Sequence, residues 1–178
     1  ASAATLNAAY DLGIPCLIQE QNSFAGLTNK TLAKKASKIC VAYEGMERFF
    51  PADRILLTGN PVRQNLSSLS LNKEEACAHF SFNSNTPTVL LIGGSLGART
   101  LNESVLHSLD EIRNSSVQFI WQTGSYYKEH IAQELQKHGQ PSNLYVTDFI
   151  RSMDMAYKAA DLVISRAGAS SISELCLL

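Results

Sequence analysis

The sequence predicts an α/β fold made of two doubly wound, Rossmann-like domains, both only partly present. Short apolar runs that are typical of buried strands alternate with segments of helical spacing, and this alternation indicates parallel sheets built from right-handed βαβ units. The alternation restarts near residues 62–86, where residues 67–85 are more polar. We therefore expect residues 1–62 to be the end of a first domain, 63–86 to be a linker and the start of a second domain, and 87–178 to be the first half of that second domain.

The first half of the chain contains three expected strands, with helical segments around them. Gly13 is a suitable residue to end the first helix, whose apolar residues recur at helical spacing. Pro61 keeps Asn60 out of the helical region, so the third strand ends in a fixed turn. The expected elements are a helix over 1–12, a strand over 14–19, a helix over 27–37, a strand over 38–43, a helical turn over 44–50 and a strand over 54–58.

The second half repeats this alternation over a longer stretch. Residues 88–92 are all β-branched or apolar, which predicts a strand that is buried on both faces. The other expected elements are a helix beginning near 72, a helix over 98–113, a strand over 117–121, a helix over 126–138, a strand over 144–146, a helix over 152–159, a strand over 162–165 and a helix from about 170.

The composition is that of a packed globular protein. Of the 178 residues, 45% are hydrophobic and 17% are charged, and the formal net charge is −1, which argues against a nucleic-acid binder that works by bulk charge. No apolar run reaches the roughly 18–20 residues needed to span a bilayer. The cysteines lack metal-binding spacing, so we expect buried, reduced thiols and no metal site. They are Cys16, Cys40, Cys77 and Cys176.

Both ends of the sequence lie inside helical patterns. Ala1 begins such a pattern without a helix-start residue, and residues 173–178 stop within another without a cap. We expect this chain to be a fragment of a longer one.

A glycine-rich turn follows the strand at 88–92 and leads into a helix. Gly93, Gly94 and Gly97 let the backbone approach a ligand closely, while free N–H groups and the helix dipole favour an anion. An ordinary tight turn is the alternative without function. The turn also matches G-x-S-x-G, which would make Ser95 the nucleophile of a hydrolase, although the later histidines all fall at helical positions.

Three further places carry side chains suited to a nucleotide. The strand at 162–165 leads into a turn of small residues, where Ser170 and Ser171 can cap the next helix and Glu174 can accept hydrogen bonds from a ribose diol. Arg63 can reach a phosphate, and the backbone at residues 148–150 can read the edge of a base. Each of these has an alternative without function. Glu174 can be an acid at a helix start, Arg63 can be a surface residue, and Phe149 can be a core residue.

A group of lysines lies along the predicted second helix. Because Phe24 and Leu27 are near them in sequence, this group is a candidate contact with anionic lipid. A solvated helix face is the simpler interpretation. The lysines are Lys30, Lys34, Lys35 and Lys38.

Four segments, taken together and in this order, closely resemble the MurG family of bacterial peptidoglycan N-acetylglucosaminyltransferases. They are Glu20-Gln21-Asn22 with Ala25-Gly26-Leu27-Thr28-Asn29-Lys30, Gly59-Asn60-Pro61-Val62-Arg63, Gly93-Gly94-Ser95-Leu96-Gly97-Ala98-Arg99, and Arg166-Ala167-Gly168-Ala169 with Ser173-Glu174. The resemblance runs over the whole chain. It implies a GT-B fold, in which residues 1–62 belong to the acceptor- and membrane-side domain and 87–178 to the UDP-sugar-binding domain.

The resemblance also implies an activity and its partners. A member of this family transfers GlcNAc from UDP-GlcNAc to the MurNAc C4 hydroxyl of lipid I, giving lipid II with inversion, without a cofactor or a required metal. It works on the cytoplasmic face of the plasma membrane as a peripheral protein. The catalytic base would lie before Ala1, so the fragment alone would be inactive. Two alternatives stay open, a non-catalytic UDP-sugar-binding half of a split transferase and the serine hydrolase.

Roles are implied for particular residues of this sequence. Ser95 would bind the diphosphate, Ile150 would meet the uracil through its backbone, and Glu174 would bind the ribose hydroxyls. The sequence departs from the family pattern at Gln19, Leu96 and Ser170, where His, Gln and Leu are common. The implied UDP-GlcNAc-binding residues are Asn22, Arg63, Gly94, Ser95, Leu96, Ile150, Ala169, Ser170, Ser171, Ile172, Ser173 and Glu174.

Overall fold

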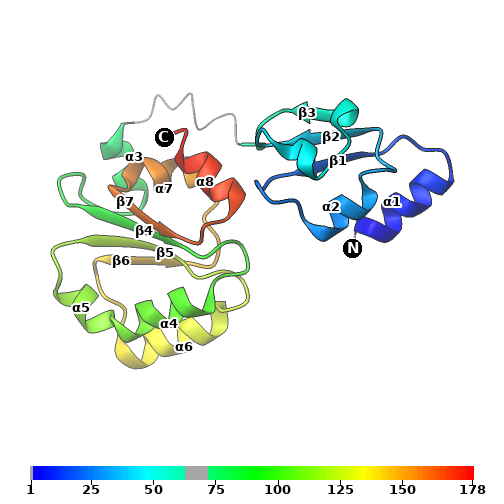
Figure 1. Cartoon of the computed structure of the whole chain (residues 1–178). Coiled ribbons are helices and arrows are strands. Elements are labelled where there is room, and N and C mark those ends of the chain that lie inside the picture. Colours follow the sequence, from blue (N-terminus) through cyan, green and yellow to red (C-terminus); the bar gives the residue numbers. More distant parts are fainter. Residues whose placement is uncertain (1, 63–71) are drawn as a thin grey trace. The chain divides into compact units, whose positions relative to one another are not determined.

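The computed structural model describes residues 2–62 and 72–178, in which two separate parallel β-sheets are found (Figure 1). The chain divides into two compact units. The first unit comprises Ala1–Arg63 together with Gly168–Cys176, and the second comprises Gln64–Ala167 together with Leu177–Leu178. The domain boundaries expected from the sequence stay a prediction.

The sheet of the first unit has three parallel strands in the order β1-β2-β3. Ile39 pairs with Ile18 on one side and with Ile55 on the other. Side chains alternate between the two faces of each strand, so Ile18, Ile39 and Val41 all point into one core with Met46 and Phe50. The elements are α1 (Ser2–Asp11), β1 (Leu17–Glu20), α2 (Leu27–Leu32), β2 (Lys38–Val41), the 3₁₀ turns Met46–Arg48 and Ala52–Arg54, β3 (Ile55–Leu57) and α8 (Ala169–Leu175).

The sheet of the second unit has four parallel strands in the order β6-β5-β4-β7. In the central pair Leu91 of β4 lies opposite Trp121 of β5, and on its other side it lies opposite Ile164 of β7. The elements are α3 (Lys73–His79), β4 (Thr88–Ile92), α4 (Arg99–His107), α5 (Leu109–Asn114), β5 (Gln118–Gln122), α6 (Lys128–His138), β6 (Leu144–Thr147), α7 (Met153–Ala159) and β7 (Leu162–Ser165).

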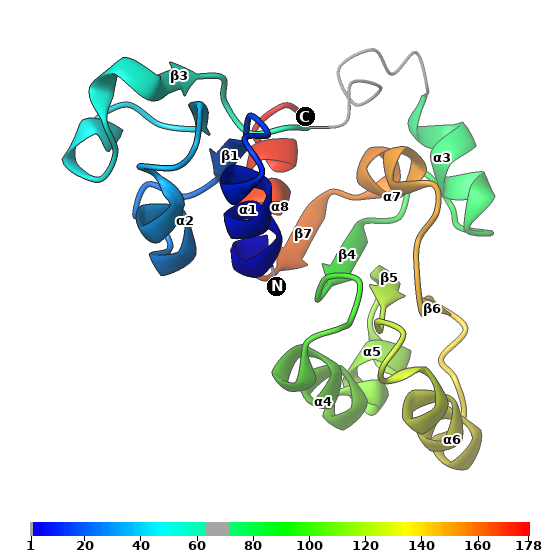
Figure 2. The ribbon, with the colours of Figure 1, turned by 90° about the vertical axis from the view of Figure 1, so that its right-hand side faces the viewer.

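Helices cover both faces of this second sheet. Helices α4, α5 and α6 lie on one face, where Trp121 is fully buried in a core with Leu91, Val105 and Ile131 (Figures 1 and 2). Helices α3 and α7 pack against each other on the opposite face. Burial on both faces is the reason that β4 reads as an uninterrupted apolar run.

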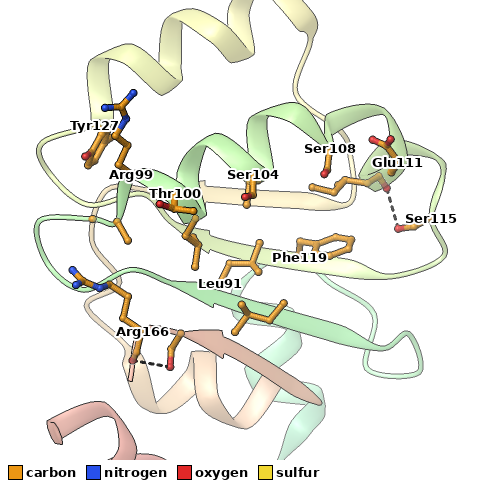
Figure 3. Close-up of a pocket in the computed structure, with 17 residues that line it drawn as sticks. Leu91, Arg99, Thr100, Ser104, Ser108, Glu111, Ser115, Phe119, Tyr127 and Arg166 are labelled. Carbon is orange, nitrogen blue, oxygen red and sulfur yellow. Dashed lines mark hydrogen bonds between the residues drawn. The ribbon is translucent and has the colours of Figure 1, made fainter. Parts of the chain in front are cut away.

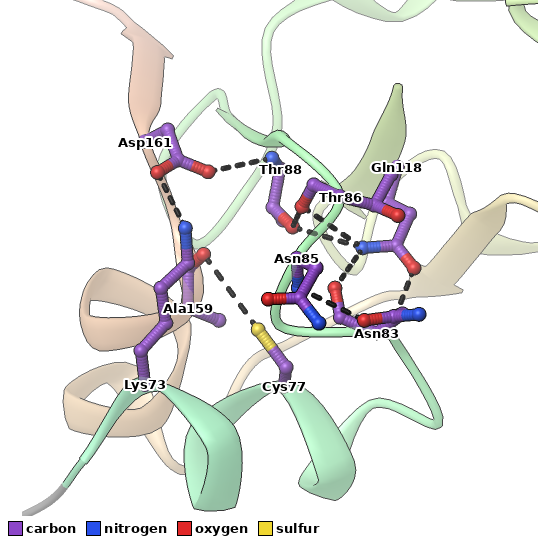
Figure 4. Close-up of polar contacts among 9 residues, drawn as sticks. All are labelled: Lys73, Cys77, Asn83, Asn85, Thr86, Thr88, Gln118, Ala159 and Asp161. Atoms are coloured by element: carbon purple, nitrogen blue, oxygen red, sulfur yellow. Dashed lines mark hydrogen bonds and ion pairs between the residues drawn. The ribbon is translucent and has the colours of Figure 1, made fainter. Parts of the chain in front are cut away.

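Polar side chains fasten the amino ends of the strands in the second unit (Figure 4). Asp161 accepts hydrogen bonds from the Thr88 N–H (2.8 Å) and from the Lys73 Nζ (2.5 Å). The Lys73 ammonium, followed by the Thr88 N–H, lowers the pKa of Asp161. Gln118 donates to the Asn83 carbonyl (2.9 Å) and accepts from the Asn83 N–H (2.8 Å). These contacts stabilise the edge of the sheet where the strands begin. The candidate functional site lies at the opposite edge, where the strands end.

Several predicted elements need correction. The predicted helix over 98–113 is two helices, because at Ser108 the backbone leaves helical geometry (φ −103°, ψ 17°). The helix predicted over 27–37 ends at Leu32, because the Ser37 N–H bonds the Cys16 carbonyl (2.7 Å) and directs the chain into β2. The strands predicted at 88–92 and 162–165 are confirmed. All four cysteines are free thiols, but Cys176 is exposed and Cys40 is only partly buried.

Candidate functional site

The glycine-rich turn at the carboxyl end of β4 is built by two residues with positive φ. Gly94 (φ +88°) and Gly97 (φ +87°) adopt a conformation that side chains disfavour, and the Gly97 N–H closes the turn on the Gly94 carbonyl at 3.0 Å. Helix α4 then begins at Arg99, and its N-cap, Ala98, makes no side-chain capping bond. An uncapped helix start behind a glycine turn favours an anion, as the sequence predicts.

The turn rests directly on the loop that follows β5. The Ser125 N–H donates to the Ser95 carbonyl at 3.1 Å. A Cβ atom added to Gly97 would lie 2.2 Å from the Thr123 carbonyl oxygen, and one added to Gly124 would lie 2.0 Å from the Gly97 nitrogen. The backbone of the turn therefore packs directly against the backbone of the loop after β5, without space for a side chain. The shape of the turn depends on both Gly97 and Gly124.

A fully buried asparagine on α4 holds the same loop by a hydrogen bond. Asn102 on α4 donates to the Thr123 carbonyl (2.8 Å) and accepts from the Trp121 indole N–H (3.0 Å). Trp121 and Asn102 are almost inaccessible to solvent, so an unpaired polar atom here would be costly. The helix behind the turn is thus tied to β5 by two polar bonds.

The loop after β6 supplies the third part of this edge. Ile150 is buried, and its N–H donates to the Gln122 Oε1 at 2.9 Å, so in this arrangement that N–H is already bonded. Asp148 pairs with Lys128 at 3.0 Å, and the hydrogen bond from Lys128 lowers the pKa of Asp148. Phe149 is about half exposed, which excludes the core role considered for it. Turn and loop therefore flank β5 on either side.

A large cavity in the second unit lies beside this edge. It has a volume of about 950 Å³ and is lined both by apolar side chains such as Leu91 and Phe119 and by polar ones such as Ser104 and Glu111 (Figure 3). Arg99, Tyr127 and Arg166 lie at one end of it. Gly97 lines this cavity, whereas residues 94–96 at the tip of the turn do not, so the cavity meets the polar edge only where the turn leads into α4.

In the first unit, the predicted contact residue Asn22 is held by a buried carboxylate. Glu20 accepts from the Asn22 N–H (3.1 Å) and Nδ2 (3.2 Å), from the Gly26 N–H (2.8 Å) and from the Asn29 Nδ2 (2.9 Å). Burial alone would raise the pKa of Glu20, but these donors outweigh it and lower the pKa. The Glu-Gln-Asn segment is therefore a preorganised loop whose shape depends on an ionised Glu20.

The segment predicted to bind the sugar phosphate and ribose forms α8. Its N-cap is Gly168, which makes no side-chain capping bond, so the capping predicted for Ser170 and Ser171 is wrong. Both serines lie inside the first turn, two and three positions past the N-cap, and therefore too far along to cap it. Ser173 accepts a hydrogen bond from the Asn60 Nδ2 at 3.0 Å, which ties α8 to the Gly-Asn-Pro turn of the same unit.

A family model, the C-terminal domain of glycosyltransferase family 28, matches residues 88–178, which include the turn, the β5 loop and α8. The chain belongs to glycosyltransferase family 28. This assignment agrees with the resemblance found from the sequence, and the match begins at the first residue of β4.

Curated relatives agree with the family 28 assignment. The chain is 61% identical to "UDP-N-acetylglucosamine--N-acetylmuramyl-(pentapeptide) pyrophosphoryl-undecaprenol N-acetylglucosamine transferase" of Parabacteroides distasonis, covering 100% of this chain and 48% of that protein. It is 49% identical to the protein of the same name in Flavobacterium psychrophilum, covering 100% of this chain and 47% of that protein. The chain spans about half the length of the curated relatives it matches.

Solved structures confirm the predicted fold class. The crystal structure of MurG from Acinetobacter baumannii is similar to this family 28 chain, with a TM-score of 0.58 and 32% identity over 99% of this chain and 47% of that one. A glycosyltransferase from Rickettsia africae, at 9% identity and a TM-score of 0.53 over 91% of this chain and 54% of that one, shares the fold. The chain is thus α/β, with parallel sheets of the GT-B type.

The remaining sequence predictions have different outcomes in this family 28 chain. Arg63 lies outside the described residues. The later histidines, at 107, 130 and 138, line a cavity of about 650 Å³ on α4–α6 that Ser95 does not line, so they give the hydrolase alternative no support. Among residues 2–62 and 72–178, no three His, Cys, Asp or Glu side chains gather as a metal site would require. The roles predicted for Gly94, Ser95, Leu96 and Ile150 stay predictions.

The four lysines do not form one row. Lys30, on α2, places its Nζ over the rings of Phe24 (4.0 Å to the centroid) and Phe49 (4.5 Å to the centroid). The other three lie beyond the end of α2 and line a separate polar pocket of about 400 Å³. These are Lys34, Lys35 and Lys38. None of the helices formed by the described residues has the length and apolar character needed to span a bilayer.

Sequence reasoning missed Gln122 and Asn102, the buried polar residues behind the turn. For Gln122 the available signal was a polar residue at the last position of an otherwise apolar strand. Its partners are 28 residues away in either direction, and strand periodicity cannot identify contacts at that distance.

Proposed function

We propose that the full-length protein containing this chain is an inverting N-acetylglucosaminyltransferase, which moves GlcNAc from UDP-GlcNAc to the MurNAc C4 hydroxyl of lipid I and so forms lipid II in peptidoglycan synthesis. The observation that carries this proposal is the 61% identity over the whole chain to a relative named for this transfer. The family model over residues 88–178 supports the same class of enzyme. Residues 1–62 would serve the acceptor side, and residues 87–178 the donor side.

The proposed chemistry places a charge where the turn can stabilise it. The bond between C1 of GlcNAc and the diphosphate breaks, and its electron pair goes to the leaving phosphate oxygen of UDP. The acceptor hydroxyl oxygen bonds to C1 from the opposite face, and its proton goes to a base that we do not assign to this chain. Backbone N–H groups at residues 94–96 and the Ser95 hydroxyl would bind the negative charge that develops on UDP.

The other predicted residues would hold the rest of the donor. Ile150 would lie against the uracil, Glu174 would accept hydrogen bonds from the ribose diol, and Arg63 would neutralise phosphate charge. Residues 169–173 would line the sugar-phosphate part, and Asn22 would contribute from the acceptor-side domain. The preorganised shape that Glu20 gives to the Asn22 loop supports this last role.

Replacing Ser95 tests the proposal. Ser95 is exposed, so Ser95→Ala should change stability by no more than about 0.5 kcal/mol. The loss of one hydrogen bond to a charged group should weaken UDP binding by roughly 10- to 100-fold, with a matching fall in transfer. Ser104 is an exposed residue of α4, and Ser104→Ala is the control that should bind UDP normally.

Two outcomes would contradict the assignment. Unchanged UDP affinity and transfer in Ser95→Ala would remove Ser95 from the site. Labelling of Ser95 by a fluorophosphonate probe in the wild-type protein would instead favour the hydrolase alternative.

We also propose that the protein is peripheral on the cytoplasmic face of the plasma membrane and contacts anionic lipid through its first unit. Phe24 and Leu27 are 68% and 81% exposed, and the Lys30 ammonium lies over the Phe24 ring. Exposed apolar side chains beside a cation suit the interface of an anionic bilayer. Lys34, Lys35 and Lys38 would add charge to the same unit.

A further inference from the structure

Gln122 is a buried residue at the carboxyl end of β5, and it joins the two loops that flank this strand. It is 5% exposed. Its Nε2 donates to the Gly94 carbonyl in the glycine-rich turn (3.1 Å), and its Oε1 accepts from the Ile150 N–H in the loop after β6 (2.9 Å). One side chain therefore bridges the predicted diphosphate-binding turn and the predicted base-binding loop.

The sheet topology explains why this position can reach both loops. β5 lies between β4 and β6, and Gln122 is in register with Ile92 on one side and with Thr147 on the other. Each of these partners is the last residue of its strand, immediately before the loop that Gln122 contacts. A side chain at the end of the middle strand thus has both neighbouring loops within hydrogen-bond distance.

A side-chain amide satisfies both contacts at once, at any pH. The Gly94 carbonyl needs a donor and the buried Ile150 N–H needs an acceptor, and a glutamine amide presents one of each. A methionine of similar length would leave both backbone groups unpaired, and a glutamate would supply only the acceptor when ionised. The requirement is for this chemical group and not simply for a side chain that fills the space.

We propose that Gln122 is a positioning residue of the nucleotide site, which fixes the spacing between the Gly93–Gly97 turn and the Ile150 loop so that both contact one UDP group. This inference rests on the proposed function. Gln122 does not itself touch the ligand; it acts through Gly94 and Ile150. When Gln122 is replaced, the two loops can move independently. Binding of the UDP group then has to order both loops, and this ordering lowers the affinity for UDP.

The same strand offers a matched control. Gln118, at the amino end of β5, is also buried (8% exposed) and also bridges backbone groups through its amide. Its partners belong to the segment that precedes β4 and to Thr88, the first residue of β4, at the opposite edge of the sheet (Figure 4). Replacing Gln118 therefore has a comparable effect on folding and removes no contact to the turn or to the Ile150 loop.

The test compares Gln122→Met with Gln118→Met in the full-length protein, using UDP as the calorimetric probe and UDP-GlcNAc in the transfer assay. Both variants should lower the melting temperature. Gln122→Met should weaken UDP binding by about tenfold and raise KM for UDP-GlcNAc with little change in kcat, because ground state and transition state lose the same positioning. Gln118→Met should change the UDP Kd by less than about twofold.

A second variant gives a readout that loss of stability does not move. In Gln122→Glu the carboxylate still accepts from the Ile150 N–H, but it offers the Gly94 carbonyl a donor only when protonated. Burial raises the pKa of such a carboxyl. Relative to wild type, the UDP affinity of Gln122→Glu should therefore recover as the pH is lowered from about 8 to about 6, while Gln118→Glu shows no such recovery.

The outcomes separate this inference from the function on which it rests. If wild type fails to bind UDP, the proposed function is wrong. If wild type binds UDP and Gln122→Met binds it equally well, or Gln118→Met loses as much affinity as Gln122→Met, the positioning role is overturned. Should Gln122→Met fail to fold, a flat pH profile for Gln122→Glu overturns it.

Discussion

Replacing Gly97 by alanine tests the close packing of the glycine-rich turn. Gly97 has φ +87°, a conformation that costs an L-residue about 1–2 kcal/mol. The added Cβ would also lie 2.2 Å from the Thr123 carbonyl oxygen and 2.7 Å from Tyr127 Cδ2. The carbonyl belongs to the backbone and cannot rotate away, so the turn must shift, at a further cost of about 1–3 kcal/mol. We expect a total loss of about 2–5 kcal/mol in the free energy of unfolding.

Gly139→Ala is the matched control for this variant. Gly139 has a positive φ (+74°) at the end of α6, but a Cβ there would meet nothing closer than the Arg113 Nη2 at 3.8 Å. Gly139→Ala should therefore lose only the cost of its backbone conformation, about 1–3 kcal/mol, because its ψ of 130° lies outside the left-handed helical region. Urea unfolding of the full-length proteins gives the two free energies, and UDP calorimetry shows whether the turn has moved.

The two variants should differ in their free energy of unfolding and in their affinity for UDP. Gly97→Ala should be the less stable protein and should bind UDP at least about tenfold more weakly than Gly139→Ala, because its clash displaces the turn itself. Equal stability of the two variants would show that the contact between Gly97 and Thr123 is looser than 2.2 Å implies. Normal UDP binding by a destabilised Gly97→Ala would refute the use of this turn as the diphosphate site.

Two further predictions concern the first unit. Because hydrogen bonds lower the pKa of Glu20 when the protein is folded, the stability they add is complete above the ordinary glutamate pKa of about 4.3 and is lost as the pH falls through the lowered value. Glu20→Gln should lose about 2–4 kcal/mol at pH 7 and show a flatter acid limb in urea unfolding; an unchanged acid limb would contradict this. Lys30→Gln should reduce co-sedimentation with anionic vesicles while Lys137→Gln does not, and equal binding of wild type to neutral vesicles would remove the role of charge.

Local sequence was sufficient where the structural cause is local. The strand at 88–92 was predicted with its bounds because five apolar or β-branched residues stand between Pro87 and a pair of glycines. The turn after it was predicted because Gly94 and Gly97 do adopt the positive φ that such a turn needs. The helix start near Asn72 was also correct, since its side chain caps the Glu75 N–H at 2.7 Å.

Local sequence was insufficient where a residue far away in the chain determines the end of an element or the role of a side chain. The second helix is short because residue 37 bonds back to Cys16, and helical periodicity contains no information about that bond. Gln122 reads as the polar end of a strand until the fold places Gly94 and Ile150 on either side of it. The capping error at Ser170 arose because the small-residue turn allowed several start positions, and the backbone uses Gly168.

The sugar-nucleotide site is tested by calorimetric titration of the full-length wild-type protein with UDP-GlcNAc, with UDP-glucose run in parallel. We expect saturable binding at one site per chain, with UDP-GlcNAc bound more tightly than UDP-glucose, and competition by UDP alone. Absence of saturable binding by UDP-GlcNAc would show that the turn at the end of β4 is not part of a sugar-nucleotide site.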